Sequence, residues 1–248
     1  MAERDTSNGS VNSVNRAFEI LSVMAAGPGH SKIGDIASQT GLPLPTVHRL
    51  LKTLEGLGHV RRLNAKGYAL GAGLMSLGEA AARQFGASAR PQLETLTAVL
   101  YESVNFAVLD SDMALYISQA SSQRAMRMFV EVGKHVPLHN TGVGKALLAQ
   151  LDPSRVAAIV ARTGLPAATE HSIRTLAELN DELDQIRTRG YAIDEQEQEI
   201  GVRCLAVPVP GAAIPSALSV SGPVARMDAD FERRAIPLLQ NAAEAVAG

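Results

Sequence analysis

The fold of the first part of the chain is decided by residues 31–62, SKIGDIASQTGLPLPTVHRLLKTLEGLGHVRR. They read as two short helices separated by the turn residues of 40–43. The second helix opens at Pro45, because in a first turn the missing N–H of a proline would have no intrahelical acceptor anyway. Apolar residues recur in both helices at the spacing of a buried stripe. These residues are Ile33, Ile36, Ala37, Val47, Leu50, Leu51 and Leu54.

The opposite face of the second helix carries hydrogen-bond donors and cations. Together with Pro45, the residues predicted to reach base edges or phosphates are Thr46, His48, Arg49 and Lys52. A short helix with such a face is what proteins insert into the major groove of DNA. An αα-hairpin with a solvated basic face has the same pattern, so these residues alone leave that alternative open.

Two short strands follow the helix pair, over 59–63 and 68–70, around an Asn/Gly/Lys turn. This hairpin indicates a winged helix-turn-helix, in which Arg61, Arg62 and Lys66 are placed to contact phosphates.

A support helix over 14–26 precedes the pair, and Ser13 is its expected cap. Its apolar stripe is Val14, Ala17, Phe18, Leu21 and Met24. Arg16 near its start either reaches a phosphate or is a solvated first-turn arginine.

Charge is distributed unevenly along the chain, although the formal net charge is only −2. Residues 1–70 hold eight lysines and arginines against five acidic residues, whereas the remainder holds 15 against 20. This asymmetry favours contact between the first part and a polyanion, with a different task for the second part.

Cys204 is the only cysteine, which excludes an internal disulfide and favours a reducing compartment. The sequence shows neither a signal peptide nor an apolar run of the length of a membrane span. We therefore expect a soluble, cytoplasmic protein.

Composition divides the chain into four segments. Residues 1–12 are polar and predict a disordered tail, and residues 13–72 hold the winged helix-turn-helix. Residues 73–89, rich in small side chains, predict a linker helix that pairs with its copy in another subunit. Residues 90–248 form a second domain.

The second domain has an α/β pattern, so the fold class of the whole chain is α+β. We expect helices over 92–101, 145–151, 154–162, 176–189 and 228–246, and strands over 104–109, 113–117, 126–132, 191–195, 202–209 and 216–221. The pattern predicts a mixed sheet with helices on one or both faces.

A glycine-flanked turn, Thr141-Gly142-Val143-Gly144, leads into one of these helices. Free N–H groups at a helix N-terminus, with glycines that permit close approach, favour an anion. Asp194 ends a strand and begins an acid-rich run with Glu195, Glu197 and Glu199. The alternative for this run is a solvated loop.

Three further side chains point to the same interior by strand alternation. Cys204 shares a strand face with Val202 and Ala206, and Ser219 shares one with Ser221. Inward hydroxyls need a hydrogen-bond partner, which is either a backbone group or a bound carboxylate. Together these signals predict a pocket for an organic acid.

A metal site is an alternative that rests on His135 and His139, with Asp194 or Cys204 as further ligands. Pro137 disfavours it, because a continuous helix would be needed to place both histidines on one face. We find no Ser/His/Asp signature, nucleophile elbow or P-loop.

Several segments together resemble the IclR family of bacterial transcriptional regulators. They are SVNRAFEIL, LPLPTVHRLLKTLEGLGHV, TGVGKALLA, and DEQEQEIGVRCLAVPV followed by ALSVSGP. The resemblance covers nearly the whole chain from about Ser13. It implies a winged helix-turn-helix, a linker helix and a GAF-like effector domain. It also implies a homodimer or dimer of dimers on a palindromic operator, with a small-molecule effector in each effector domain.

The resemblance implies an effector pocket at the positions that the residues themselves indicate. These are Gly142, Val143, Asp194, Cys204, Ser219 and Ser221. Our interpretation is a ligand-responsive repressor that needs no cofactor and is not an enzyme.

Two rival interpretations remain. In the first, the chain is an enzyme with Cys204 as its nucleophile, and the helix-turn-helix serves assembly. In the second, the chain is an architectural DNA binder. The second rival is disfavoured, because the second domain would then have no task.

Overall fold

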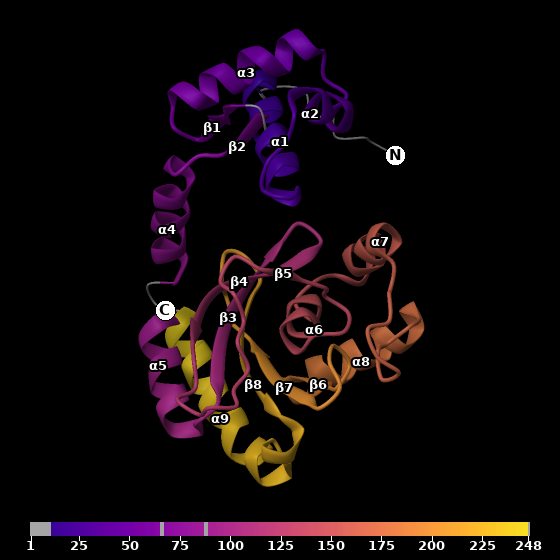
Figure 1. Cartoon of the computed structure of the whole chain (residues 1–248). Helices are drawn as coiled ribbons and strands as arrows, with labels where there is room; N and C mark the ends of the chain where they lie inside the picture. The colour runs from indigo at the N-terminus through magenta and orange to yellow at the C-terminus, as the bar shows by residue number, and fades with distance from the viewer. Residues whose placement is uncertain (1–10, 65–66, 87–88, 248) are drawn as a thin grey trace. The chain divides into compact units, whose positions relative to one another are not determined.

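The computed structural model describes residues 11–64, 67–86 and 89–247 of the chain (Figure 1). The chain divides into two compact units after Ala81. The predicted tail over 1–12 falls largely outside the described residues, and so does Lys66.

The first unit is a winged helix-turn-helix, as predicted. Its elements are α1 (Asn12–Ala26), α2 (Ile33–Thr40), α3 (Leu44–Gly56), β1 (Val60–Leu63) and β2 (Gly67–Leu70). Gly41 ends α2 in the left-handed conformation, with a φ of 66° that glycine adopts without strain. The core joins all three helices to the hairpin. Its buried residues are Ile20, Leu21, Met24, Ile36, Val47, Leu51, Leu54, Val60 and Tyr68.

Two expectations for α1 are wrong. The helix begins at Asn12, so Ser13 lies inside the first turn and does not cap it. Val14 and Phe18 are 51% and 65% exposed, although they share the helical spacing of the buried Leu21 and Met24. Spacing alone did not reveal that the core of this small unit covers only the C-terminal half of α1.

α4 (Gly73–Gly86) follows the winged helix and crosses the division between the units. Its exposed apolar residues include Met75 and Leu77. A linking role for residues 73–89 stays a prediction.

The second unit is an α/β domain built on a six-stranded sheet with the strand order β5-β4-β3-β8-β7-β6. The strands are β3 (Ser103–Asp110), β4 (Met113–Ala120), β5 (His135–Val136), β6 (Ala192–Glu195), β7 (Val202–Pro208) and β8 (Ser216–Pro223). The helices are α5 (Ala89–Leu100), α6 (Gly142–Leu148), α7 (Pro153–Thr163), α8 (Leu176–Arg189), the short 3₁₀ helix η2 (Val224–Arg226) and α9 (Ala229–Ala247).

Helices cover both faces of this sheet (Figure 1). α5 and α9 lie side by side on one face, and their buried residues share a core with Val104, Leu205 and Leu218. α6, α7 and α8 pack over the other face, which contributes small residues such as Ala107 and Ala206. Those small side chains let α6 approach the sheet closely.

The α+β fold class is confirmed, but two details of the second unit differ from the prediction. Every described strand pairing is antiparallel, so the sheet is not mixed. Residues 126–132 form no strand and run as an irregular segment, in which Met126 and Phe129 are each 71% exposed. Strand-like composition there reflects apolar residues that the sheet does not bury.

Candidate functional sites

α3 separates its buried and exposed residues as a DNA-reading helix requires. Val47, Leu51 and Leu54 are buried, whereas Pro45, His48, Arg49 and Lys52 are exposed and Thr46 is half-buried. The first turn of α3 carries no acidic residue. The exposed face therefore presents cations and donors to any polyanion that approaches it.

The predicted phosphate contacts are spread over the hairpin and α1. Arg61 and Arg62 are both exposed on β1, and adjacent residues of a strand point to opposite faces. Arg61 also donates from Nε to the carbonyl oxygen of Leu70, at 3.3 Å. Arg16 is exposed on α1. Contacts of these residues with DNA stay predictions, as does the role of Lys66, which lies outside the described residues.

The strand register brings four predicted effector residues together in the second unit. Asp194 pairs with Cys204, and Cys204 pairs with Ser221. Ser219 lies two residues from Ser221 and pairs with Ala206. Because paired residues share a face, all four lie on the face of the sheet that α6 covers.

The glycines of α6 serve its packing on the sheet. A Cβ at Gly142 would lie 2.8 Å from Cys204 Sγ, and a Cβ at Gly144 would meet the carbonyl oxygen of Leu138. Thr141 caps the helix, since its Oγ1 accepts from the Gly144 amide at 3.1 Å. The Gly144 amide is thus already used. Helix geometry leaves the amides of Gly142 and Val143 without an intrahelical acceptor.

Asp194 is a buried carboxyl group with an unusual proton affinity. Its side chain accepts from the amide of Glu197 at 2.8 Å and from that of Gln198 at 3.4 Å. Burial, followed by the nearby Glu197 carboxylate, raises the pKa of Asp194 to about 7. Asp194 therefore carries a proton for part of the time near neutral pH.

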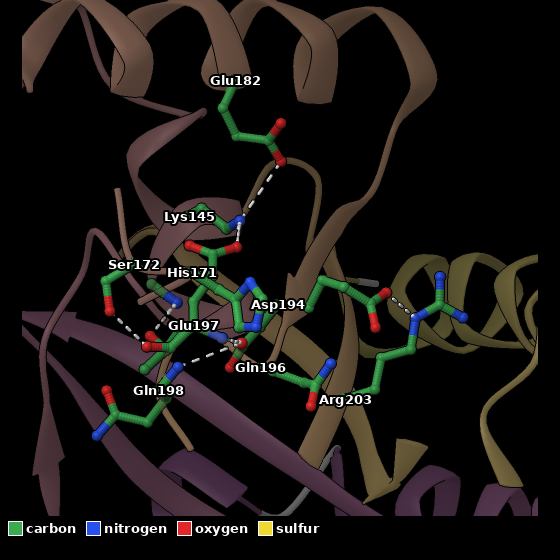
Figure 2. A network of polar contacts seen from close by, with 12 residues as sticks. Lys145, His171, Ser172, Glu182, Asp194, Gln196, Glu197, Gln198 and Arg203 are labelled. Atoms are coloured by element: carbon green, nitrogen blue, oxygen red, sulfur yellow. Dashed lines mark hydrogen bonds and ion pairs between the residues drawn. The ribbon is translucent and has the colours of Figure 1, made fainter. Parts of the chain in front are cut away.

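A buried lysine, which the sequence analysis missed, lies beside this carboxyl group. Lys145 on α6 is 1% exposed and forms an ion pair with Glu197 and a longer one, at 3.5 Å, with Glu182 of α8 (Figure 2). The three residues line a polar cleft of about 460 Å³. The signal for Lys145 was a charged residue inside the apolar run GKALLA.

The acid-rich run after Asp194 is not a fully solvated loop. Glu197 is 7% exposed, and burial raises its pKa although Lys145 lowers it. Glu195 and Glu199 are exposed, and Glu195 pairs with Arg203 at 2.6 Å. The solvated-loop alternative holds for these two residues and fails for Asp194 and Glu197.

Cys204 is buried, as strand alternation predicted. Burial and the Asp194 carboxylate raise the pKa of its thiol to about 12. A thiol with this pKa is protonated at neutral pH and is a poor nucleophile. The geometry thus opposes the enzyme interpretation.

The two histidines of the metal alternative have separate partners. His135 is exposed and lies 2.7 Å from Asp110, whereas the buried His139 lies 3.1 Å from the carbonyl oxygen of Pro166. Burial lowers the pKa of His139. Among the described residues, no group of three or more His, Cys, Asp or Glu side chains is placed to hold a metal ion.

None of the helices in the described parts of the chain is long and apolar enough to cross a membrane.

Comparisons with known proteins cover almost the whole chain. Residues 81–248 match the family model of the bacterial transcriptional regulator IclR C-terminal domain, and residues 13–64 match the IclR helix-turn-helix domain. The transcriptional repressor IclR of Escherichia coli is 36% identical over 233 residues, which are 90% of this chain and 84% of that protein.

Solved structures share the fold. The IclR transcriptional regulator from Alicyclobacillus acidocaldarius superposes with a TM-score of 0.81 at 28% identity, over 96% of this chain and 98% of that one. An IclR homologue from Microbacterium hydrocarbonoxydans, solved with 4-hydroxybenzoate, gives 0.76 at 22% identity, over 95% and 97%.

Proposed function

This chain belongs to the IclR family of bacterial transcriptional regulators, and we propose that it is a repressor whose operator affinity is set by a small organic acid. The observation that carries the proposal is that the same chain contains an exposed cationic face on α3 and a separate domain that gathers polar side chains beneath α6. We further propose that it acts in the cytoplasm, where operator DNA is found.

In the DNA-bound state, α3 enters the major groove with Thr46, His48, Arg49 and Lys52 toward base edges or nearby phosphates. Cations on the hairpin and on α1 hold the backbone on either side. The predicted backbone contacts are Arg16, Arg61, Arg62 and Lys66. The proposal therefore separates residues that choose the sequence from residues that give salt-dependent affinity.

The effector is proposed to place its carboxylate at the amides of Gly142 and Val143 and the hydroxyls of Ser219 and Ser221. An ionised aspartate beside that carboxylate would repel it. Because the pKa of Asp194 is about 7, a modest further rise on binding would keep Asp194 protonated, so that it donates to the ligand. The Gly144 amide donates to the Thr141 hydroxyl of the helix cap, so an effector contact at Gly144 would share that amide and stays a prediction.

A homodimer, or a dimer of dimers, on a palindromic operator is also proposed. Val11, which precedes α1 as its N-cap, and Val14 and Phe18 on α1 follow one another at three- and four-residue spacing, and all are more than half exposed. Such an apolar stripe on a small unit supports a contact with a second copy. A two-fold dimer would read a palindrome, because each copy meets an equivalent half-site.

The first test is fluorescence anisotropy with DNA from upstream of the protein's own gene, against scrambled competitor at two salt concentrations. Binding that survives the competitor and weakens steeply with salt is expected. Acetate, succinate and 4-hydroxybenzoate are then added to the complex, and one of them should release the DNA. Absence of binding to any DNA, with or without these acids, would overturn the proposal.

A further inference from the structure

A small cavity of the second unit lies beside α7, apart from the residues proposed for the effector carboxylate. Its volume is about 170 Å³, and it is bordered by the start of β4, the residues after β5, the end of α6, and α7 with the loop that follows it. Most of its lining is apolar, with Leu138, Leu148, Ile159, Val160 and Leu165. None of the glycine, valine and serine positions proposed for the carboxylate lines it. The cavity is therefore a separate site.

The size of the cavity limits what it holds. An apolar cavity of about 150 Å³ in another protein holds a single benzene ring, whereas sites for drug-sized ligands begin at roughly 300 Å³. A volume of about 170 Å³ therefore fits one aromatic ring. The leucine, isoleucine and valine side chains of the lining favour an apolar body, because burial of apolar surface drives binding.

His139 is a buried polar residue at this cavity. It is 4% exposed, and it belongs to the lining. Its Nε2 lies 3.1 Å from the carbonyl oxygen of Pro166. Because a carbonyl oxygen only accepts, Nε2 carries a proton and donates. Burial also lowers the pKa of His139, so the ring is neutral at pH 7 and Nδ1 holds a lone pair.

The Nδ1 atom of His139 has no hydrogen-bond partner within the described ranges of the chain. It is also not one of their fully enclosed unpartnered atoms, which include Asn140 Oδ1 and Glu197 Oε2. Nδ1 thus borders accessible space, although the residue is almost wholly buried. Since a buried acceptor needs a donor, a ligand with one hydroxyl group would satisfy it.

The charges beside the cavity disfavour an acid as its ligand. Asp112 lines the cavity and is held by Arg162 of α7 in a bidentate ion pair, with both contacts at 2.7 Å. No lysine or arginine belongs to the lining that the structure describes. A bound carboxylate would lose its water beside another carboxylate and gain no cation of its own, which is costly.

We propose that this cavity binds a small neutral phenol, whose ring lies among the leucine, isoleucine and valine side chains and whose hydroxyl group donates to His139 Nδ1. A phenol with a pKa of about 10, like the tyrosine side chain, is uncharged at pH 7. Its single donor matches the single unpartnered ring nitrogen of His139. The inference goes beyond the proposed function, because neither operator DNA nor the effector acid is involved.

Calorimetric titration of the full chain with phenol, toluene and benzoate tests the class of ligand. Phenol and toluene should bind the wild type. In His139→Phe the hydroxyl group would be buried without an acceptor, so the affinity for phenol should fall about tenfold while that for toluene changes little. His171→Phe, which replaces an exposed histidine of the same domain, is the control and should bind both as the wild type does.

A second pair of variants tests the location. Val160→Phe fills the cavity from α7 and should abolish binding of phenol and toluene alike. Ala161→Phe adds the same ring at an exposed position of the same helix and should bind like the wild type. Any binding of benzoate should be the same in both variants, because it occurs elsewhere. Far-UV circular dichroism establishes that each variant is folded.

Nuclear magnetic resonance of the wild type needs no variant at His139. With nitrogen-15-labelled histidine, phenol should shift the Nδ1 resonance of His139, since this atom gains a hydrogen bond, and toluene should shift it less. An Nδ1 resonance that phenol leaves unaltered, or an equal affinity for phenol in His139→Phe, would refute the role of His139.

The remaining outcomes decide the site itself. Absence of phenol binding to the wild type would overturn the proposal. Phenol binding that survives Val160→Phe would place the ligand outside this cavity, with the same consequence. Benzoate that binds as tightly as phenol and is lost in Val160→Phe would contradict a neutral ligand. Each of these results is independent of the repressor proposal, because none requires DNA or an effector acid.

Discussion

Replacement of Asp194 by asparagine should stabilise the second domain at neutral and alkaline pH. Asp194 is 4% exposed, and burial with the neighbouring Glu197 raises its pKa from 3.8 to about 7. An asparagine keeps an oxygen that can accept from the amides of Glu197 and Gln198. It also resembles the protonated acid in shape and charge, so it removes the cost of ionising a buried carboxyl group.

The direction in which stability changes with pH follows from which state, folded or unfolded, holds the proton. Between the unfolded pKa of about 3.9 and the folded pKa of about 7, the folded domain keeps a proton that the unfolded chain has released. The stability from protonated Asp194 is therefore complete below pH 4 and is lost as the pH rises to 7. A shift of about three units corresponds to roughly 4 kcal/mol, a large share of a typical domain's stability.

Urea unfolding followed by far-UV circular dichroism suits this chain, which has no tryptophan. Between pH 5 and pH 8 the free energy of unfolding of the wild type should fall by about 3 kcal/mol because of this group. That of Asp194→Asn should fall by correspondingly less. Asp152→Asn, which changes an exposed carboxylate before α7, is the control and should follow the wild type. The same pH dependence in Asp194→Asn and wild type would refute the reasoning.

Arg49→Ala should weaken binding to the specific operator by about 1–3 kcal/mol if the guanidinium makes a bidentate base contact. Arg62→Ala should weaken binding to all DNA equally, because phosphate contacts carry no sequence information. Fluorescence anisotropy with specific and scrambled DNA distinguishes these two effects. Equal losses of affinity for both DNAs in Arg49→Ala would show that Arg49 contacts only phosphate. The double variant Ser219→Ala/Ser221→Ala should lose acid binding in calorimetric titration, and unchanged affinity would discard the pocket assignment. Cys204 should resist maleimide in the folded protein at pH 7, since its thiol is buried with a pKa of about 12; rapid labelling detected by mass spectrometry would contradict this.

Periodicity was sufficient to predict the winged helix-turn-helix, because each of its elements is a local pattern. The stripe of α3 is buried at Val47, Leu51 and Leu54, with Leu50 only partly covered. The same rule failed at Val14 and Phe18, where helical spacing predicted burial. Periodicity shows which residues share a face of a helix, but the size of the core decides how far along that face burial extends.

Strand alternation predicted the inward direction of Cys204, Ser219 and Ser221, because direction is a property of one strand. Their partners depend on contacts between segments far apart in the sequence. Asn105 is separated from Ser219 by 114 residues, and Lys145 from Glu197 by 52. No local pattern encodes such pairings. Polar residues inside apolar runs could still have identified Asn105 and Lys145, because a buried polar group needs a partner.

The effector role of the TGVG turn stays a prediction, and close packing provides a reason for its glycines that requires no ligand. Side chains at Gly142 and Gly144 would collide with Cys204 and the Leu138 backbone, so both positions would require glycine even without an effector. Glycine at a helix start is therefore weak support for an anion site. The stronger support is a group of buried polar side chains on the face of the sheet that α6 covers, where Ser219 and Ser221 contact Asn105 of the neighbouring strand. Buried hydroxyls and amides persist in a core only when each finds a partner, and the contacts of Asn105 with the two serines, at 3.4 and 3.5 Å, are at the long end of the range for hydrogen bonds.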